Sequence, residues 1–563
     1  LKHTKGLVPV YPETEGITSK YLRFLIKPLL SGLQLNDPTP GTILKKYDFP
    51  SLSDAVKNIH FPNSEDKARI AKERLAFDDL MLFQIKALLE RRKVNQLKSV
   101  PISFNEELVK EFVSKLPFEL TKDQKIALFE ILKDLEKKYP MNRLMEGDVG
   151  SGKTVVALVA AIEVVNAGYQ AVIMAPTEVL AQQHYRTISE LTAGCDIKVG
   201  LLTSSTATLN GKEPKKTVIK NELSAGTPML LIGTHAVIQK DVSFGKLAFV
   251  ILDEQHRFGI QQRAALVKNQ EYVPHLLSMT ATPIPRTLAL TIYGDLDISI
   301  IKEKPENRQK IDTRIVSPLQ RKNAYQFLRE EVDKERQVFV VCPRIEPSDP
   351  KEAVKTNNRQ SKMNILWQEV KAVEEEYKKL SQEIFPDLKV AMLHGKLKPK
   401  EKNEIMSDFK DGKYDILVST SVIEVGVDIP NATIMAIESA ERFGLAQLHQ
   451  FRGRVGRGEH QSYCLLFSSS ADKSTNQRLK ALVICDDGFE LAEKDMAIRG
   501  PGEFMGTKQS GMPDLAMASL ANVELIKKAR LEARLLLKED PSLNHHPLLR
   551  DRLTEFQKMT HFE

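Results

Sequence analysis

The 563-residue sequence has few cysteines, and the four that it has lie far apart. Cys195, Cys342, Cys464 and Cys485 show neither the short spacing of zinc ligands nor that of a redox pair. Separate thiols in a chain of this size are typical of buried residues in a reducing compartment. They disfavour a disulfide-stabilised secreted protein, and we expect a cytoplasmic location.

The sequence also lacks an apolar run long enough to span a membrane, and no signal peptide opens it. We therefore expect no membrane partner. Neither sign of charge dominates, since 81 Lys and Arg stand against 74 Asp and Glu, for a formal net charge of +7. This mild excess is compatible with a polyanionic partner but is weak evidence for one. Because the first residue is Leu1 rather than methionine, we expect N-terminal residues to be missing.

What the sequence does contain is a complete phosphate-binding loop: Gly147, Asp148, Val149, Gly150, Ser151, Gly152, Lys153 and Thr154. In such a loop, backbone N–H groups wrap the nucleotide phosphates, the lysine reaches the β- and γ-phosphates, and the hydroxyl binds Mg²⁺. A helical run from Val155 to Val165 follows, so that its N-terminal dipole faces the anion. The loop predicts a nucleotide-driven machine, with a structural glycine-rich turn as the alternative.

Two stretches, 116–300 and 310–470, alternate short apolar runs with helical patterns. Such alternation is typical of a parallel sheet covered by helices, so we expect an α/β fold with two consecutive lobes. The predicted strands are 171–174, 229–232, 249–252, 276–279, 338–341, 389–393, 416–418, 434–437 and 464–467. The polar stretch 346–364 is expected to be a mobile surface insertion.

The remaining segments differ in character. Residues 1–50 are rich in Pro and Gly, which favours a connector. Glu65–Arg92 has apolar residues at helical spacing and charges between them, which predicts one long amphipathic helix. Residues 471–563 are mostly helical in pattern, interrupted by the glycine-rich Arg499–Phe504.

The predicted strand 249–252 ends in Asp253-Glu254-Gln255-His256. Open α/β sheets bind their ligands at the carboxyl ends of their strands. We expect Asp253 to hold Mg²⁺ through water, Glu254 to orient and deprotonate the attacking water, and His256 to belong to the same nucleotide site. The alternative is a solvated acidic turn.

Other candidate residues of the first lobe follow strands or open helices. The amide of Gln124, preceded by Phe118, can match an adenine edge, although it can equally belong to a capped helix start. Thr282 follows a strand and is expected to hydrogen-bond the carboxylates and sense the γ-phosphate. Thr177 and Thr234 lie in loops whose hydroxyls and amides suit nucleic-acid phosphates.

The segment from Gln450 to Arg457 places three arginines among glycines. Glycine allows close approach of the backbone, and a guanidinium presented across a cleft can neutralise charge on the transferred phosphoryl group, an effect worth about 10³–10⁵ in rate. Arg457 is the first choice for this arginine finger and Arg454 the second, and an exposed basic turn is the alternative. Thr420 is expected at nucleic-acid phosphate and Asp428 at the nucleotide ribose.

The phosphate loop thus lies in one predicted lobe and the arginine finger in the other. ATP bound between them would draw the lobes together, and hydrolysis would let them part. If both lobes hold one nucleic acid, the cycle becomes stepwise movement along it.

The order of these motifs resembles superfamily 2 helicases and translocases of the Asp-Glu-x-His type. Three C-terminal segments look like the TRG segment that the RecG family of branched-DNA translocases shares with the transcription–repair coupling factor Mfd: Asp487–Asp495, Arg499–Gly506 and Gln509–Gly511. Three further segments are similar to RecG: Tyr11–Gly16, Ala71–Asp78 and Asp253–Gly259.

The resemblance implies two tandem RecA-like lobes and an ATP- and Mg²⁺-dependent motor that remodels stalled forks and Holliday junctions. It implies that Arg499 and Gln509 couple nucleotide state to DNA movement, that single-stranded-DNA-binding protein is a partner, and that the chain acts as a monomer. The expected domains are 1–112 (tail of the wedge domain, linker and long helix), 113–302, 303–470, and 471–563 (TRG hairpin and C-terminal helices). Most of the family's N-terminal wedge domain is expected to be absent.

Three alternatives stay open at this point. An Mfd-like translocase would need an RNA-polymerase-binding domain, for which no segment is left. An RNA helicase of the Asp-Glu-x-His group would leave the TRG-like segments unexplained. An ATP-regulated DNA-binding scaffold without turnover is the alternative from another class, and DNA-stimulated ATP hydrolysis distinguishes it from a motor.

Overall fold

The computed structural model describes most of the chain, which divides into two compact units. The described residues are 7–14, 16–239, 241–254, 272–282, 296–303, 309–343, 373–420, 429–456, 458, 460–468, 473–499 and 522–559. The helical unit consists of Leu1–Gln96, Ile284–Leu296 and Met496–Glu563, and the two-sheet unit consists of Leu97–Pro283 and Asp297–Asp495. The predicted mobile insertion at 346–364 lies outside the described residues.

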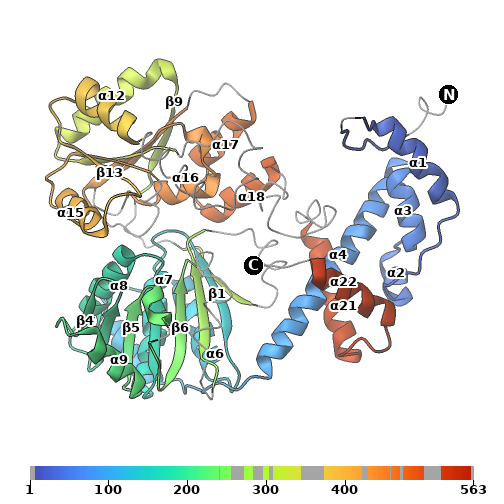
Figure 1. Ribbon diagram of the computed structural model, residues 1–563, viewed down its shortest axis with the longest axis horizontal. Coiled ribbons are helices and arrows are strands. Elements are labelled where there is room, and N and C mark those ends of the chain that lie inside the picture. Colours follow the sequence, from blue (N-terminus) through green and yellow to red (C-terminus); the bar gives the residue numbers. More distant parts are fainter. Residues whose placement is uncertain are drawn as a thin grey trace. The chain divides into compact units, whose positions relative to one another are not determined.

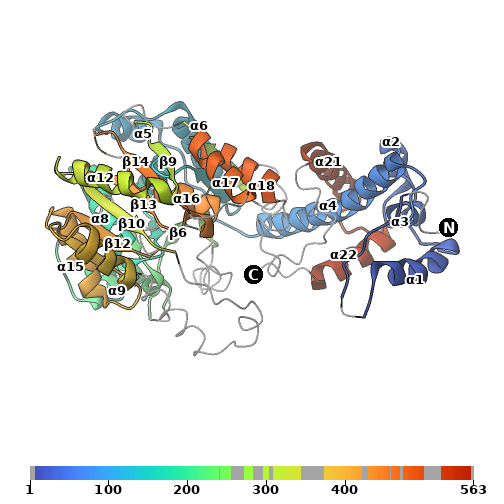
Figure 2. The same cartoon turned by 90° about the horizontal axis from the view of Figure 1, so that it is seen from above.

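The helical unit joins the two ends of the chain around one long helix. Its helices are α1 (Ser19–Ser31), α2 (Gly41–Tyr47), α3 (Leu52–His60), α4 (Glu65–Asn95), α21 (Val523–Glu539) and α22 (Pro547–Met559). Helix α4 begins with Ser64 capping the N–H of Lys67 and ends with Arg92 and Lys93, whose charges suit its C-terminal dipole. Figures 1 and 2 show α21 and α22 alongside α4.

Apolar side chains from both ends of the chain form one core in this unit. Phe77, Leu80 and Phe83 of α4 are buried together with Ala533 of α21 and Phe556 of α22. The rings of Phe83 and Phe556 meet edge to face, with centroids 4.6 Å apart. The long helix predicted over Glu65–Arg92 is therefore confirmed, and it is the element on which the C-terminal helices pack.

The expectation that residues 1–50 form a connector is wrong for two segments, because α1 and α2 are helices. The side chain of Thr18 caps α1, which contains Pro28 in its interior. Prolines and glycines usually interrupt helices, so their abundance in this region predicted a connector. They do not prevent a helix from beginning next to them or, as at Pro28, from continuing through them.

The first lobe is built on an eight-stranded sheet with the order β4-β3-β5-β2-β6-β7-β1-β8, parallel except for the β3–β4 pair. Its strands are β1 (Asn142–Gly147), β2 (Gln170–Met174), β3 (Val199–Leu202), β4 (Ala207–Leu209), β5 (Met229–Gly233), β6 (Leu247–Asp253), β7 (His275–Thr280) and β8 (Asp297–Ile301). Its helices are α5 (Glu106–Ser114), α6 (Lys122–Leu135), α7 (Lys153–Asn166), α8 (Glu178–Leu191) and α9 (Lys216–Ser224).

The second lobe is built on a six-stranded parallel sheet with the order β11-β12-β10-β13-β14-β9. Its strands are β9 (Asp312–Val316), β10 (Gln337–Val341), β11 (Val390–Leu393), β12 (Ile416–Ser419), β13 (Ala432–Ile437) and β14 (Tyr463–Phe467). Its helical elements are α12 (Arg321–Val332), the π-helix Lys379–Ile384, α15 (Pro399–Lys410), α16 (Leu445–Arg452), α17 (Lys473–Ile484) and α18 (Gly488–Arg499). Figure 1 shows helices covering both sheets.

Alternate residues of the central strands feed different cores. Ala171 and Ile173 of β2 enter the core shared with α6 and α7, whereas Val172 enters the core shared with α9. Phe339 and Val338 of β10 divide in the same way. A strand that is buried on both faces appears in the sequence as a continuous apolar run. All nine runs predicted to be strands are strands in the structure. None of the described helices combines the length and the apolar character that crossing a membrane needs.

Candidate functional site

The phosphate loop joins the end of β1 to the start of α7, as the sequence predicts. Gly150 and Gly152 have φ of +78° and +80°, a left-handed conformation that side chains rarely adopt. A Cβ on Gly147 would lie 2.5 Å from Ser151 Oγ, and a Cβ on Gly152 would collide with the side chain of Gln124. Glycine is therefore required at these positions, and the loop presents the N-terminus of a 14-residue helix to an anion.

Lys153 is the first residue of α7, and its side chain is buried over the loop. Its Nζ donates to the carbonyl oxygens of Gly147 and Asp148, at 2.7 and 2.9 Å. Burial lowers the pKa of Lys153. The carboxylates of Asp253 and Glu254 oppose this effect, while the positive charge of Arg454 adds to it.

Asp253 ends β6 at the same sheet edge, and a histidine that the sequence did not single out holds it. His184 Nε2 of α8 lies 2.8 Å from Asp253 Oδ2. Burial alone would raise the pKa of Asp253, but the His184 hydrogen bond and the positive charge of Lys153 outweigh it, so the pKa lies below its usual value. The carboxylate therefore stays ionised, as a Mg²⁺ ligand must.

Glu254, the predicted base, follows directly in a strained conformation. Its φ is +58°, in the left-handed region that residues with side chains seldom occupy, and its side chain is buried. Strain of this kind gathers at functional sites, where the surrounding fold holds it in place. This backbone conformation fixes the direction in which the Glu254 side chain leaves the end of β6.

Gln124, one of the two residues predicted to meet adenine, contacts the phosphate loop. The Gln124 amide donates from Nε2 to the Ser151 carbonyl at 2.8 Å and accepts the Thr121 N–H at Oε1, also at 2.8 Å. Gln124 therefore belongs to a capped helix start. Its contact with adenine stays a prediction, and to make it the amide would have to give up its hydrogen bonds to Ser151 and Thr121. Phe118 is 45% exposed, which leaves its ring free to stack.

Three predicted threonines are tied into the loops at this edge of the first sheet. Thr177 caps α8 by accepting the N–H of Leu180, and the loops of Thr177 and Thr234 meet where Ala175 N donates to Gly233 O at 2.8 Å. The Thr282 hydroxyl bonds the Thr280 hydroxyl at 2.7 Å instead of a carboxylate. In the second lobe, Thr420 is buried just beyond β12.

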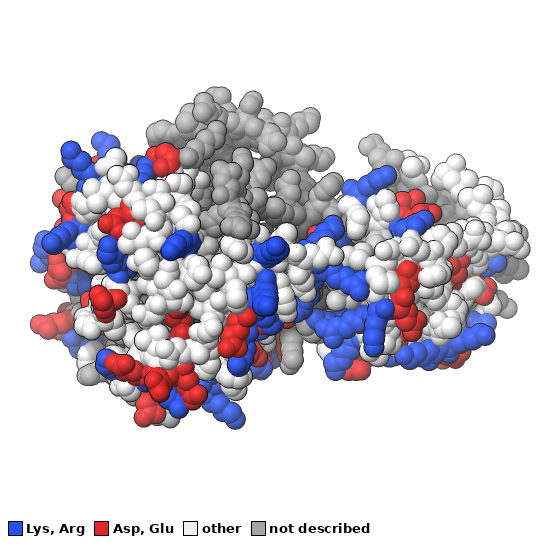
Figure 3. Space-filling view, turned by 90° about the horizontal axis from the view of Figure 1, so that it is seen from below, with Lys and Arg blue, Asp and Glu red and all other residues white. Residues whose placement is uncertain are grey.

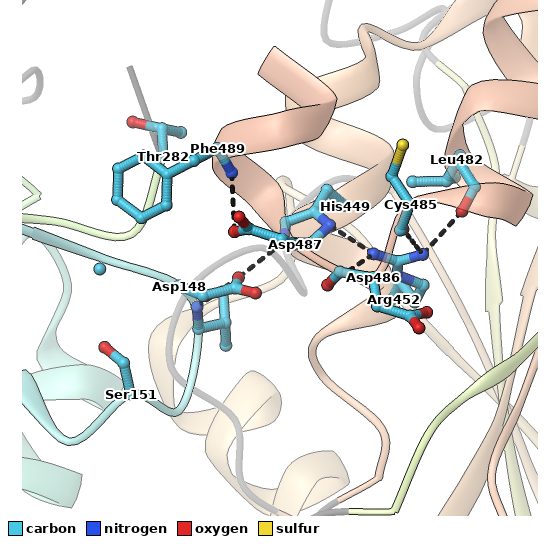
Figure 4. A network of polar contacts seen from close by, with 12 residues as sticks. Asp148, Ser151, Thr282, His449, Arg452, Leu482, Cys485, Asp486, Asp487 and Phe489 are labelled. Carbon is cyan, nitrogen blue, oxygen red and sulfur yellow. Dashed lines mark hydrogen bonds and ion pairs between the residues drawn. The ribbon is translucent and has the colours of Figure 1, made fainter. Parts of the chain in front are cut away.

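The second lobe meets the phosphate loop through α16 and the turn after it. His449 Nε2 lies 2.6 Å from Asp148 Oδ1 (Figure 4). A Cβ on Gly453 would come within 2.9 Å of Val149 Cβ. Arg454 is buried, and its positive charge acts on both Lys153 and Asp253. The structure thus brings the second-choice arginine to the phosphate loop, and the predicted Gln450 is buried on the same helix.

His256, Asp428, Arg457 and Gln509 lie outside the described residues, and Arg499 ends α18 with its side chain outside them. Their roles stay predictions.

The chemistry of the site fits Mg²⁺ held by Thr154 and Asp253. Mg²⁺ prefers oxygen ligands and takes few from the protein, filling its shell with phosphate oxygens and water. Thr154 lies in the first turn of α7, and Asp253 is a buried carboxylate with a lowered pKa at the same sheet edge. In the described part of the chain, no cluster of three His, Cys, Asp or Glu forms a separate metal cage.

Three family models match the chain in order. They are a DEAD/DEAH box helicase model over residues 121–291, a helicase conserved C-terminal domain model over 348–459, and a model described as ATP-dependent DNA helicase RecG, domain 3, C-terminal, over 485–561. The third match favours RecG over the Mfd-like alternative and the RNA helicase alternative.

Individual relatives agree with these models. The chain is 47% identical to the ATP-dependent DNA helicase RecG of Synechocystis sp. over 98% of its own length and 64% of that protein. It is 40% identical to the RecG of Bacillus subtilis over 98% of its length and 78% of that protein.

A solved structure of RecG bound to a three-way DNA junction superposes with a TM-score of 0.75 at 37% identity, covering 95% of this chain and 66% of that one. The chain therefore spans about two thirds of the length of such relatives. With this extent of identity and coverage, and with a match to a RecG model, the chain belongs to the RecG family of ATP-dependent DNA helicases.

Proposed function

We propose that this chain hydrolyses ATP between its two lobes and uses the cycle to move along branched double-stranded DNA, remodelling stalled replication forks and Holliday junctions. The observation that carries the proposal is the convergence of Lys153 and Asp253 of the first lobe with Arg454 of the second. A phosphoryl-transfer site needs such positioned charges more than it needs covalent chemistry.

Each residue has a distinct task in the proposed reaction. The loop N–H groups and Lys153 bind and orient the β- and γ-phosphates, which requires Lys153 to exchange its bonds to the loop carbonyls for phosphate oxygens. Glu254 orients the attacking water and accepts its proton. Arg454, with Arg457, neutralises the charge that develops on the transferred phosphoryl group. Mg²⁺ on Thr154 and Asp253 would supply charge neutralisation at the phosphate oxygens.

DNA is proposed to bind along the loops that follow the strands. On the face drawn in Figure 3, Lys and Arg side chains are mixed with Asp and Glu side chains over the two-sheet unit and outnumber them over the helical unit. The loops of Thr177 and Thr234 are joined by a backbone hydrogen bond, so both can hold one phosphate backbone. Arg499 and Gln509 are proposed to couple nucleotide state to movement of the duplex.

The proposal includes further expectations that follow from the family. The chain acts as a monomer, uses Mg²⁺, and meets single-stranded-DNA-binding protein at the fork. It works in the cytoplasm, which accords with its four free cysteines, three of them buried.

The test compares ATP hydrolysis in the presence of a fork, linear duplex and single-stranded DNA, together with branch migration of a Holliday junction. A motor for branched DNA gives the highest ATPase rate on the fork and moves the junction only with ATP. ATP binding with no stimulation by any DNA would favour the scaffold without turnover. Stimulation by single strands alone would contradict the duplex assignment.

A further inference from the structure

A buried histidine that the proposed reaction does not use links the second lobe to the phosphate loop. His449 of α16 and Asp148 of the loop are 301 positions apart in the sequence, yet His449 Nε2 and Asp148 Oδ1 lie 2.6 Å apart. Both side chains are buried, with 4% and 6% of their surface exposed. A polar contact that is largely shielded from water is stronger, and its loss costs more, than one on the surface.

The other ring nitrogen of His449 fixes which atom carries the hydrogen. Arg452 Nη2 lies 2.8 Å from His449 Nδ1, and a guanidinium can only donate. Nδ1 must therefore accept, so the hydrogen sits on Nε2 and is donated to the carboxylate of Asp148. Figure 4 shows the three side chains in line. The direction of each hydrogen bond is set by the arginine.

Arg452 in turn is anchored to the backbone at the end of α17. Its Nη1 donates to the carbonyl oxygens of Leu482 and Cys485, at 2.7 and 2.9 Å. The last carbonyls of a helix lack partners within the helix and favour a positive charge. His449 is therefore held rigidly on its own lobe, and its orientation does not depend on the first lobe.

On the loop side, Asp148 already holds part of the phosphate cradle. Its Oδ1 accepts the N–H of Val149 at 2.7 Å, and Val149 is the residue that a Cβ on Gly453 would meet. A single carboxylate oxygen thus joins a backbone N–H of the loop to the histidine of the other lobe. The position of the second lobe is transmitted to the backbone that surrounds the phosphates.

We propose that His449 is a positioning residue, which sets the phosphate loop for hydrolysis through Asp148 when the two lobes meet. This inference rests on the proposed function. His449 touches no phosphate in this scheme and acts through the loop, so its loss lowers the rate of hydrolysis more than it lowers the affinity for ATP. A misplacement of the reacting groups by about 1 Å is enough to reduce a rate by about 100-fold.

The test uses two variants of similar size, one without hydrogen-bonding groups and one with an amide that can donate to Asp148 and accept from Arg452. His449→Leu fills the space but cannot donate, and it is expected to lower the DNA-stimulated kcat about 10- to 100-fold, with the KM for ATP changed less than about threefold. His449→Gln can donate from its amide and is expected to recover most of the rate. His460→Gln, on an exposed residue of the same lobe, is the matched control and keeps the wild-type rate.

A purely structural role would reduce the melting temperature in both His449 variants alike and give Gln no advantage over Leu, which would overturn the inference. If His449→Leu does not fold, a cycle of Asp148→Asn, His449→Ala and the double variant decides, because His449→Ala removes the donor and Asp148→Asn removes the carboxylate charge. The inference expects the double variant to lose no more activity than the worse single variant, whereas losses that multiply contradict it. An inactive wild-type chain overturns the proposed function itself, and an active wild type beside an equally active His449→Leu overturns only this inference.

Discussion

The two lobes of the two-sheet unit share one strand order but differ at the one loop that binds phosphate. In chain order, the six strands from β1 to β7 without β4 are arranged as β9 to β14 are, and the first lobe adds β4 and β8 at its edges. After β1 comes the glycine-rich loop, whereas after β9 comes Ser317-Pro318-Leu319-Gln320. The fold therefore provides a place for a nucleotide, and the loop decides whether it can bind one.

The positions that carry the chemistry in the first lobe carry an ion pair in the second. Arg321 begins α12 as Lys153 begins α7, and Glu438 follows β13 as Asp253 ends β6. Arg321 donates two hydrogen bonds to Glu438, at 3.1 and 2.7 Å. In the second lobe the cation and the carboxylate thus satisfy each other, while in the first lobe they are set beside a loop that can take phosphate.

The largest expected effect comes from removing the arginine finger that the second lobe is proposed to contribute to the nucleotide site of the first lobe. Arg457→Ala should lower the DNA-stimulated kcat by about 10³–10⁵, because the finger neutralises charge only in the transition state. Steady-state ATPase measurements on Arg457→Ala and Arg454→Ala rank the two candidates. A smaller loss for Arg457→Ala than for Arg454→Ala would transfer the finger role to Arg454, which the structure brings to Lys153.

Removing the lysine of the first lobe comes next. Lys153→Ala should lower kcat by about 10²–10³, comparable to the loss of one preorganised donor, and should leave most DNA binding intact. ATPase rates and the affinity for a labelled fork test both halves of this expectation. Full turnover in the variant would show that the phosphate loop is not the site.

The corresponding change in the second lobe should affect stability instead. Arg321→Ala leaves Glu438 buried without its partner and should lower the free energy of unfolding by about 2–3 kcal/mol, less than for a fully buried pair because Arg321 is 28% exposed. Urea denaturation measures this loss, and ATPase activity at low temperature should stay near wild type. If Arg321→Ala instead lost ATP binding without losing stability, Arg321 would have a role in nucleotide binding similar to that of Lys153.

The smallest expected effect concerns a buried carboxyl next to the phosphate loop. Burial raises the pKa of Glu146 near the end of β1 to about 8, whereas Val316 at the end of β9 is apolar. A raised carboxyl pKa means that folding favours the protonated form, so stability falls as pH rises from about 4.5 towards 8. Glu146→Gln should therefore raise the free energy of unfolding by about 1–2 kcal/mol at pH 5.5.

The gain from Glu146→Gln should vanish below about pH 4.5, where the carboxyl is protonated in both states. Denaturation midpoints over this pH range measure it, with Glu107→Gln on the exposed face of α5 as the control. A gain that does not change with pH would show that the charge of Glu146 is not its cause.

Much of this architecture can be predicted from the sequence because buried parallel strands are apolar throughout. The runs that became β2, β5 and β6 are examples, and the phosphate loop follows from its glycines and lysine alone. Strands β1, β3, β4, β8 and β9 were not predicted. Two of them carry polar residues that break the apolar run, the buried Arg143 of β1 and the exposed Arg314 of β9. Arg143 is accommodated by its ion pair with Asp134, a partner that periodicity cannot reveal.

The candidate site divides in the same way. Asp253 and Lys153 belong to motifs, so their types and spacing predict their roles. His184 and His449 belong to no spacing pattern, and each is recognised only by the carboxylate that the fold brings to it from 69 or 301 positions away. The order of strands in the sheets sets these meetings, and local sequence does not contain that order.

The joint core of the helical unit has a consequence for synthesis of the protein. The apolar stripe of α4 leaves the ribosome first, yet α21, which covers it, is made more than 400 residues later. At a translation rate of about 5–20 residues per second, the nascent stripe waits roughly 20–90 s for its partner. During that interval its apolar side chains are exposed to chaperones and to aggregation.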